Sequence, residues 1–323
     1  MGRLIMKLYH RIIKILWDLW CLVSIGGIWP RYIEPYLLFT KKLPLEIKNT
    51  PEDLKILHFS DLHIHKKIPQ HFLNKLTRKI NRCNPDLILF TGDFLRFAED
   101  GDKTLKRLEI FLNSLSAKHG CYAIFGNHDY QDWVSRKPDG SISKASMDEP
   151  AILKGFKLLF KKNRRLTTPK SRQNLIIKEN NNLLKTLAKT KFQILHNSSV
   201  TIDIRGYKLN IVGLGEYWLD QCIPEKAFQT CNPKAPTIAL LHNPDGVDKL
   251  IGHPCDLILS GHTHGGQVNL PWLWKKFTPI QNLSMKYGYL KYRGYKIFVT
   301  RGVGSSEPFR WFAPPEIALF RKP

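Results

Sequence analysis

The feature that most constrains the fold is a series of short apolar runs, each ending just before a polar cluster. The first two, LKILHFSD at 54–61 and DLILFTGD at 86–93, are separated by the helical pattern HFLNKLTRKINR at 71–82. Strands that alternate with amphipathic helices predict an α/β fold, here a layered β-sandwich flanked by helices. The later runs are CYAIFGNHD, LNIVGLGE, TIALLHNPD, DLILSGH and KIFVTRG.

The polar clusters all follow the carboxyl ends of predicted strands. In open α/β sheets this edge carries the ligand crevice, so side chains from five separate runs are expected to meet there. Asp, Asn and His offer the oxygen and imidazole ligands of divalent ions such as Mn²⁺, Fe²⁺ or Zn²⁺. Two ions about 3.5 to 4 Å apart would need a bridging carboxylate, and Asp93 is the natural candidate.

The charge balance points to an anionic partner. Lys and Arg outnumber Asp and Glu by 50 to 27, which gives the 323 residues a formal charge of +23. Nucleic acid, an anionic membrane and a phosphorylated substrate all satisfy this balance. The six cysteines are scattered without a CxxC pair, which favours reduced thiols and a cytoplasmic location.

Residues 4–29 are strongly apolar, but they carry one charged stripe. Lys7, Arg11, Lys14 and Asp18 recur at steps of four, three and four, as on one face of a helix. We therefore expect a membrane-associated amphipathic helix that lies in the plane of the interface. A single span and a helix docked on the protein's own core are the alternatives, and no small-residue cleavage site of a secretory signal follows.

The domain organisation follows from these patterns. We expect an N-terminal membrane segment and linker at 1–52, and a catalytic domain at 53–323 that contains a helical, lid-like insert at about 131–191. The insert includes AILKGFKLLFKKNRRL, with one apolar side and one basic stripe. It is either a surface helix with a solvated basic face or a lid that presents cations to substrate phosphates. The stripe contains Lys154, Lys157, Lys161 and Arg164.

The motifs DLH, GDF, GNHD, LLHNPD and GHTH resemble, in order and spacing, the signature of calcineurin-like metallophosphoesterases. This resemblance implies the architecture of that superfamily, phosphoester hydrolysis and two divalent ions, with Mn²⁺ expected and Fe²⁺ or Zn²⁺ as alternatives. It also implies that His128 is the catalytic residue and donates a proton to the leaving oxygen. The implied ligands are Asp61, His63, Asp93 and His264 for one ion, and Asp93, Asn127, His242 and His262 for the other.

One position departs from the family pattern. Many relatives carry an acid three residues beyond the bridging Asp, where this chain has Arg96. Asp129 or another carboxylate would then have to orient His128, or the role of His128 is weaker here. Arg96 could instead contact a substrate phosphate.

The substrate class follows from a second resemblance. GHTHGGQVNLP and TRGVGSSEPFRWFAPPEIALF resemble a bacterial membrane-associated branch of the superfamily. Within it, the chain is similar to the pyrophosphatases that split UDP-2,3-diacylglucosamine into UMP and 2,3-diacylglucosamine 1-phosphate in lipid A synthesis. This resemblance implies a lipid-linked nucleotide substrate and the cytoplasmic face of the bacterial inner membrane, whose anionic surface is the expected partner.

Two other functions remain open at this point. A nuclease or another metal-dependent phosphodiesterase would use the same ions, but the apolar N-terminal segment has no purpose in a nuclease, so nucleic acid is disfavoured. A non-catalytic binding scaffold is the alternative outside the enzymes. No protein partner is expected.

Overall fold

The first of two six-stranded sheets contains the strands that precede three of the polar clusters. Strands β2, β3, β4 and β7 are parallel, whereas β14 runs antiparallel to β2. In spatial order the sheet consists of β1 (Phe39–Pro44), β14 (Glu316–Arg321), β2 (Lys55–Phe59), β3 (Leu87–Phe90), β4 (Cys121–Ala123) and β7 (Phe192–Ile194).

The second sheet carries the remaining two clusters. Its four inner strands are parallel, and its two outer strands, β8 and β12, are antiparallel to their neighbours. In spatial order it consists of β12 (Gly288–Tyr292), β13 (Tyr295–Val299), β11 (Leu257–Ser260), β10 (Thr237–Leu240), β9 (Tyr207–Gly213) and β8 (Ser198–Ile204).

The computed structural model describes residues 2–98, 101–132, 134–136, 142–144, 160, 177–271, 273–278, 280–305 and 307–322. Within the expected insert it describes only a small hairpin of β5 (Val134–Arg136) and β6 (Ile142–Lys144), a few flanking residues and the helix α5 (Asn181–Leu187). The basic stripe of Lys154, Lys157, Lys161 and Arg164 lies outside the described residues.

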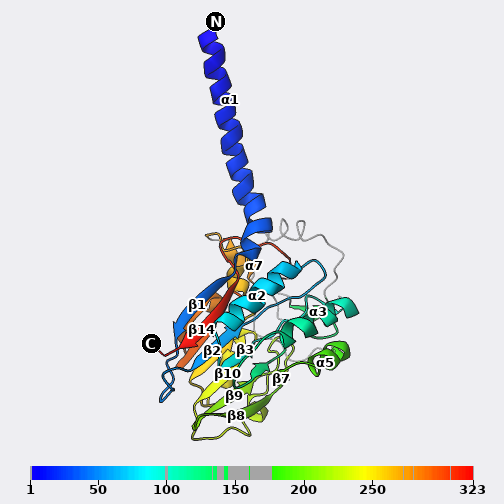
Figure 1. Cartoon of the computed structure of the whole chain (residues 1–323), viewed down its shortest axis with the longest axis vertical. Coiled ribbons are helices and arrows are strands. Elements are labelled where there is room, and N and C mark those ends of the chain that lie inside the picture. The colour runs from blue at the N-terminus through cyan, green and yellow to red at the C-terminus, as the bar shows by residue number, and fades with distance from the viewer. Residues whose placement is uncertain are drawn as a thin grey trace.

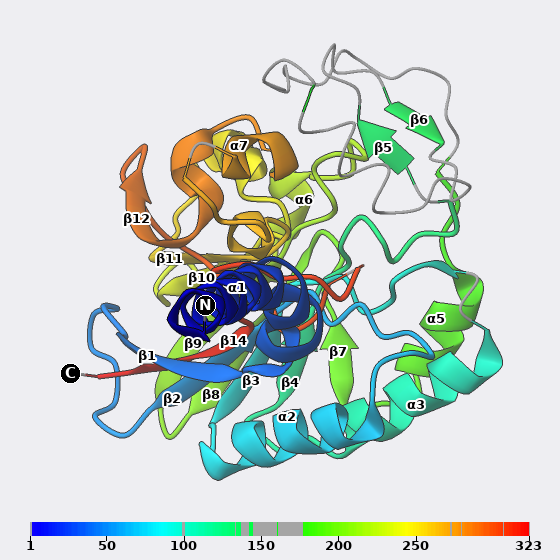
Figure 2. The ribbon, with the colours of Figure 1, turned by 90° about the horizontal axis from the view of Figure 1, so that it is seen from above.

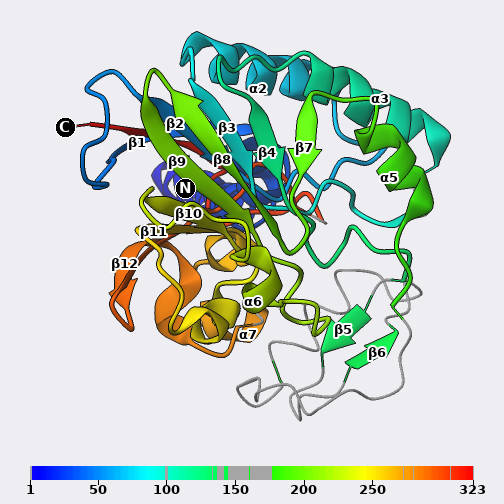
Figure 3. The same ribbon diagram turned by 90° about the horizontal axis from the view of Figure 1, so that it is seen from below.

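The two sheets pack face to face, and helices cover the outer face of the first sheet (Figures 2 and 3). These helices are α2 (Gln70–Arg82), α3 (Asp102–Asn113) and α5. Successive residues of a strand point to opposite faces. In β3, Ile88 and Phe90 accordingly pack toward the helices, while Leu87 and Leu89 join the core between the sheets. Burial on both faces explains the continuous apolar runs of the sequence and confirms the layered α/β prediction.

Short helical segments cover the outer face of the second sheet and connect its strands. That face buries Val212, Ala239, Ile258, Ile297 and Val299. The short helical segments after residue 200 are α6 (Pro224–Ala227), η4 (Pro244–Leu250), η5 (His264–Gly266), α7 (Trp274–Phe277) and η6 (Leu283–Lys286).

The N-terminal helix projects away from this body (Figure 1). Helix α1 (Gly2–Val23) continues into a π-helical segment, η1 (Ser24–Ile33), and a 3₁₀ turn, η2 (Glu34–Tyr36). Residues 11–36 are long and apolar enough, by length and composition, to cross a membrane. Trp17 is 65% exposed and Leu22 is 67% exposed, so these side chains do not dock on the protein's own core.

Strand β1 lies within the stretch that we expected to be a membrane segment and linker. It pairs in parallel with β14, with Phe39 opposite Glu316 and Pro44 opposite Arg321. The first sheet therefore takes in residues upstream of position 53. The chain leaves the projecting helix and enters the edge of this sheet within a few residues.

Candidate metal centre

The polar residues that follow β2, β3, β4, β10 and β11 meet at one edge of the two sheets. All seven residues expected to hold metal are buried there. Parallel strands deliver their carboxyl ends to a common edge, which is why residues up to about 200 positions apart in the chain become neighbours. They are Asp61, His63, Asp93, Asn127, His242, His262 and His264.

One group of these side chains surrounds His63. Its Nε2 lies 3.1 Å from Nε2 of His264, 3.4 Å from Oδ2 of Asp93 and 3.9 Å from Oδ1 of Asp61. The Nε2 of His264 lies 3.5 Å from the same Asp61 oxygen. Four potential ligand atoms therefore face one small volume.

The second group surrounds Asn127. Its Oδ1 lies 3.2 Å from Nε2 of His242 and 2.9 Å from Nδ1 of His262. The Nε2 of His242 also lies 3.3 Å from Oδ2 of Asp93. A single oxygen of Asp93 thus lies within 3.4 Å of a histidine nitrogen in each group.

These spacings fit divalent cations. Bonds from a divalent ion to nitrogen and oxygen ligands are about 2.0 to 2.2 Å long, so two ligands of one ion would lie roughly 3 to 3.5 Å apart. Most of the distances above are in that range. The donor set of carboxylate, amide and imidazole is also the one that borderline divalent ions prefer. His242 is oriented for such a role, because its Nδ1 donates to the Thr91 carbonyl over 2.6 Å and its Nε2 faces Asp93.

Electrostatics favour the binding-competent form of four expected ligands but not of Asp61 and His242. Burial raises the pKa of Asp61 to about 7. Burial alone would lower the pKa of His242, but the field of Asp93 and other carboxylates outweighs it and raises this pKa to about 10, so a bound cation would have to displace both protons. Burial lowers the pKa of His264 to about 3 and holds the pKa values of His63 and His262 well below their ordinary range. Neutral imidazole is the form that binds a metal. Burial alone would raise the pKa of Asp93, but the fields of His242 and other nearby histidines outweigh it and hold this carboxylate ionised.

The backbone around the centre is held in an unusual conformation. Asp61, His63, Asp93, His262 and His264 all have positive φ, between 44° and 69°. Such conformations cost energy for residues with a Cβ and persist only where surrounding contacts enforce them. The Asp61 N–H donates to the Gly92 carbonyl and the His63 N–H to the Asp93 carbonyl, each over 2.9 Å. These two hydrogen bonds join the loop after β2 to the loop after β3, so each loop holds the other in its conformation.

His128 lies beside the first group. Its ring and that of His63 are edge to face, with centroids 4.7 Å apart. Its backbone N–H donates to Oδ1 of Asp93 over 2.9 Å, and its Nδ1 lies 2.7 Å from the Arg96 carbonyl oxygen. Because a carbonyl only accepts, the proton of this bond belongs to Nδ1. Arg96, which replaces the acid found at this position in many relatives, thus contacts His128 through its main-chain carbonyl.

Asp129 contacts main-chain donors around the bridging residue. Its Oδ2 accepts from the N–H groups of Asp93 and Gly126, both over 2.8 Å, and its Oδ1 accepts from Phe94 over 2.8 Å and Leu95 over 3.2 Å. These bonds join the loop after β3 to the loop after β4. Asp129 thereby fixes the backbone that carries Asp93.

Arg310 was not found by sequence reasoning, although it lies against the centre. It is fully buried, and its Nη2 lies 3.4 Å from Nδ1 of His264. Burial lowers the pKa of Arg310 to about 10. In the sequence, Arg310 stands between apolar residues in FRWFAPP, and this pattern does not reveal that its side chain is buried. Arg96, in contrast, pairs its guanidinium with Glu307.

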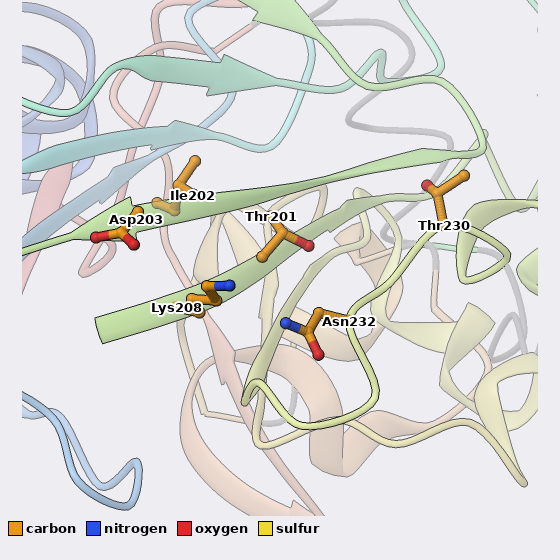
Figure 4. Close-up of a pocket in the computed structure, with 6 residues that line it drawn as sticks. All are labelled: Thr201, Ile202, Asp203, Lys208, Thr230 and Asn232. Carbon is orange, nitrogen blue, oxygen red and sulfur yellow. The ribbon is translucent and has the colours of Figure 1, made fainter. Parts of the chain in front are cut away.

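Two surface hollows lie apart from this centre. One, of about 310 Å³, lies on β8 and β9 and is lined by Thr201, Asp203 and Lys208 among others (Figure 4). The larger, of about 710 Å³, lies between α2 and the edge of the first sheet. We call it the basic groove, because its charged lining is entirely cationic: Lys42, Lys55, Lys75, Arg78, Lys79, Arg82 and Arg321.

Comparisons with known proteins agree with this geometry. A sequence profile described as calcineurin-like phosphoesterase matches residues 54–266. The chain is 36% identical over 317 residues to the UDP-2,3-diacylglucosamine pyrophosphatase LpxG of Chlamydia muridarum (strain MoPn / Nigg), covering 91% of this chain and 92% of that protein. The LpxG protein of Chlamydia trachomatis serovar D is 36% identical over 310 residues, with the same coverage.

A more distant relative is the phosphodiesterase YaeI of Escherichia coli (strain K12). It is 27% identical over 299 residues, covering 92% of each chain. The family profile covers most of the catalytic core, and the two chlamydial relatives extend the similarity over nearly the whole length. The chain therefore belongs to the calcineurin-like phosphoesterase family and is a metal-dependent hydrolase.

Proposed function

We propose that this hydrolase cleaves the pyrophosphate of UDP-2,3-diacylglucosamine, releasing UMP and 2,3-diacylglucosamine 1-phosphate for lipid A biosynthesis. The substrate assignment is supported by the similarity to two proteins named for that activity over 91% of the chain. The observation that carries the chemistry is the Oδ2 atom of Asp93, which lies 3.4 Å from one histidine nitrogen and 3.3 Å from another. A shared carboxylate is what a pair of cations requires.

In this proposal the centre holds two divalent cations, with Mn²⁺ expected and Fe²⁺ or Zn²⁺ as alternatives. When bound, the cations would activate a water molecule and offset charge on the phosphoryl oxygens. Asp93 contributes to both positions. Asp61, His63 and His264 complete the first position, and Asn127, His242 and His262 complete the second.

His128 is the proposed catalytic residue. The Arg96 carbonyl, 2.7 Å from Nδ1, keeps a proton on that nitrogen and fixes the plane of the ring. The Nε2 atom is then the nitrogen that exchanges a proton with the leaving-group oxygen. A backbone carbonyl supplies the orientation that an acid supplies in many relatives, so an arginine at position 96 is compatible with this role.

Several cations are proposed to contact the phosphates of the substrate. Arg96 is close to the centre, but its guanidinium is paired with Glu307, so a phosphate would have to exchange for this carboxylate. The remaining candidates are the basic stripe of the proposed lid-like insert: Lys154, Lys157, Lys161 and Arg164.

We further propose that the N-terminal helix anchors the enzyme at the cytoplasmic face of the bacterial inner membrane. Arg11, Lys14 and Asp18 share one stripe of α1, which supports an in-plane arrangement, while the length of the apolar segment also suits a span. The pairing of β1 with β14 supports a domain that begins near residue 38.

The competing function is a phosphodiesterase that acts on another substrate. Similarity to the E. coli phosphodiesterase favours it, and the basic groove would suit a polyanion such as nucleic acid. However, Lys55 of this groove begins β2, whereas Asp61 follows the opposite end of the same strand. A polyanion in the groove would therefore lie at the far end of the sheet from the metal centre.

The test is a hydrolysis panel with Mn²⁺, before and after chelation with EDTA. The substrates are UDP-2,3-diacylglucosamine, its deacylated analogue, a simple aryl phosphodiester and single-stranded DNA. We expect metal-dependent release of UMP, fastest from the acylated substrate. Hydrolysis of only the three soluble substrates would remove the lipid assignment, and salt-sensitive cleavage of DNA alone would favour the competing function.

A further inference from the structure

We propose that the base of the N-terminal helix is part of the metal centre. Glu34, at the end of the helix, and Arg310, beneath His264, would act as positioning residues that hold the loop 301–304 against Asp61. This inference rests on the proposed dinuclear site. It adds that the membrane anchor and the metal ligands belong to one hydrogen-bonded unit.

Glu34 fastens the helix base to the loop that carries Arg310. Its carboxylate is 2% exposed and accepts from the Trp29 indole N–H over 2.7 Å, from the Phe312 N–H over 3.0 Å and from the Ala313 N–H over 2.6 Å. A buried carboxylate is tolerated when such donors satisfy it, and charge-assisted bonds are stronger than neutral ones.

A main-chain bond reinforces the same junction. The Pro30 carbonyl accepts from the Arg310 N–H over 2.8 Å. Pro30 is buried, whereas residues 11–20 of α1 are exposed. One side of the last turn, with Pro30 and Glu34, is therefore buried against the body beside the metal centre, while Tyr32 and Ile33 remain exposed.

The Arg310 side chain connects this junction to the loop 301–304 by hydrogen bonds. Its Nη2 donates to the carbonyls of Arg301 over 2.9 Å, Gly302 over 3.4 Å and Gly304, while its Nη1 donates to the Ala313 carbonyl over 2.8 Å. A planar guanidinium can hold several acceptors in a fixed fork, which a lysine ammonium cannot reproduce. His264 lies at the edge of this fork.

The loop 301–304 in turn packs directly on the first metal position. The Val303 N–H donates to the Ser60 carbonyl over 2.9 Å, and the Gly304 N–H donates to the Asp61 carbonyl over 2.7 Å. Gly302 is so close that a Cβ built on it would lie 2.7 Å from the Cβ of Asp61. A displacement of the helix base would therefore reach Asp61 and His264 through a short series of contacts.

The experiment measures Mn²⁺ affinity of the full-length protein in detergent micelles, after removal of metal, by calorimetric titration. The variants are Glu34→Gln and Arg310→Lys. Glu46→Gln is the matched control. Glu46 pairs with Lys296 on the surface and is distant in sequence from the loop 301–304 and from Arg310. Groups that orient metal ligands typically contribute about 10- to 100-fold to affinity. We expect a loss of that size in both variants and none in the control.

A second readout separates positioning from general damage. Raising Mn²⁺ to saturation should restore most of the turnover of Glu34→Gln with an aryl phosphodiester, because a weakened site refills whereas a misfolded chain does not. If Arg310→Lys lacks a cooperative thermal transition, Glu34→Gln decides the question alone. Wild-type Mn²⁺ affinity in a folded Glu34→Gln protein would overturn the inference.

The same titration distinguishes this inference from the function on which it rests. A wild-type protein that binds no Mn²⁺ would overturn both. A wild-type protein that binds Mn²⁺ but leaves UDP-2,3-diacylglucosamine intact would remove only the substrate assignment, and the affinities of the variants would still decide whether the helix base positions the ligands.

Discussion

Replacing Gly126 by alanine should misplace the shared carboxylate of the metal centre. A Cβ at this position would lie 2.2 Å from Oδ1 of Asp93 and 2.7 Å from Cε1 of His242. Ordinary carbon–oxygen contacts are about 3.3 Å or longer, so Asp93 or the backbone must move by about 1 Å. The φ of Gly126 lies outside the left-handed region, so the clash rather than the backbone conformation causes the effect.

The expected loss can be estimated from that displacement. A misplacement of about 1 Å at a reacting centre costs on the order of 100-fold in rate, equivalent to about 2.7 kcal/mol of transition-state stabilisation. We therefore expect Gly126→Ala to lower kcat/KM roughly 100-fold at a Mn²⁺ concentration that saturates the wild-type protein. Overpacking should also lower the free energy of unfolding by about 1 to 3 kcal/mol.

The assay combines steady-state hydrolysis of an aryl phosphodiester with a count of bound Mn²⁺ per chain and thermal unfolding of the metal-free protein. Gly27→Ala is the matched control, because a Cβ there would meet nothing within 4 Å. A folded Gly126→Ala protein with kcat/KM within about threefold of wild type would refute the reasoning, because Asp93 would then tolerate the shift.

Three further perturbations test other parts of the structure. His128→Asn should keep Mn²⁺ affinity but lower kcat by about 100- to 10,000-fold; a matching loss of affinity would contradict its role in proton exchange. Burial raises the pKa of Glu216 from 4.5 to about 7, so the unfolded chain releases this proton first as pH rises. The contribution of Glu216 to the free energy of unfolding of the metal-free protein should therefore fall as the pH rises from about 5 to about 7. Denaturant titrations at several pH values give the dependence of the free energy of unfolding on pH. Glu216→Gln should remove the contribution of Glu216 to this dependence, and an unchanged pH dependence would contradict the raised pKa. Finally, the full-length chain should float with anionic vesicles, whereas a chain without residues 2–23 should not; equal recovery of both would exclude α1 as the anchor.

The parts of the fold that could be predicted from the sequence are those set by local pattern. The run LILF at 87–90 is buried on both sides of its strand, so its continuous apolar character indicates a central strand. Polar residues directly after such strands must lie at the sheet edge. This local rule is sufficient to bring Asp61, Asp93 and His242 together without knowledge of their distances.

Long-range pairings could not be predicted in this way. Strand β1, FTKKLP, is an edge strand with no fully buried residue, and its partner β14 lies nearly 280 positions away. Likewise, the sequence GNHD does not reveal that the Asp129 carboxylate accepts from main-chain donors around Asp93. Nor does it reveal that a carbonyl orients His128. Such contacts depend on loop geometry, which periodicity does not encode.

The projecting helix and the metal edge lie at the same end of the molecule, since Pro30 contacts Arg310 and Arg310 lies beside His264. With the proposed membrane anchor and lipid substrate, the enzyme would search for that substrate in two dimensions. Its velocity should follow the mole fraction of substrate within the bilayer, so inert phospholipid should slow turnover even when the total amount of substrate is constant.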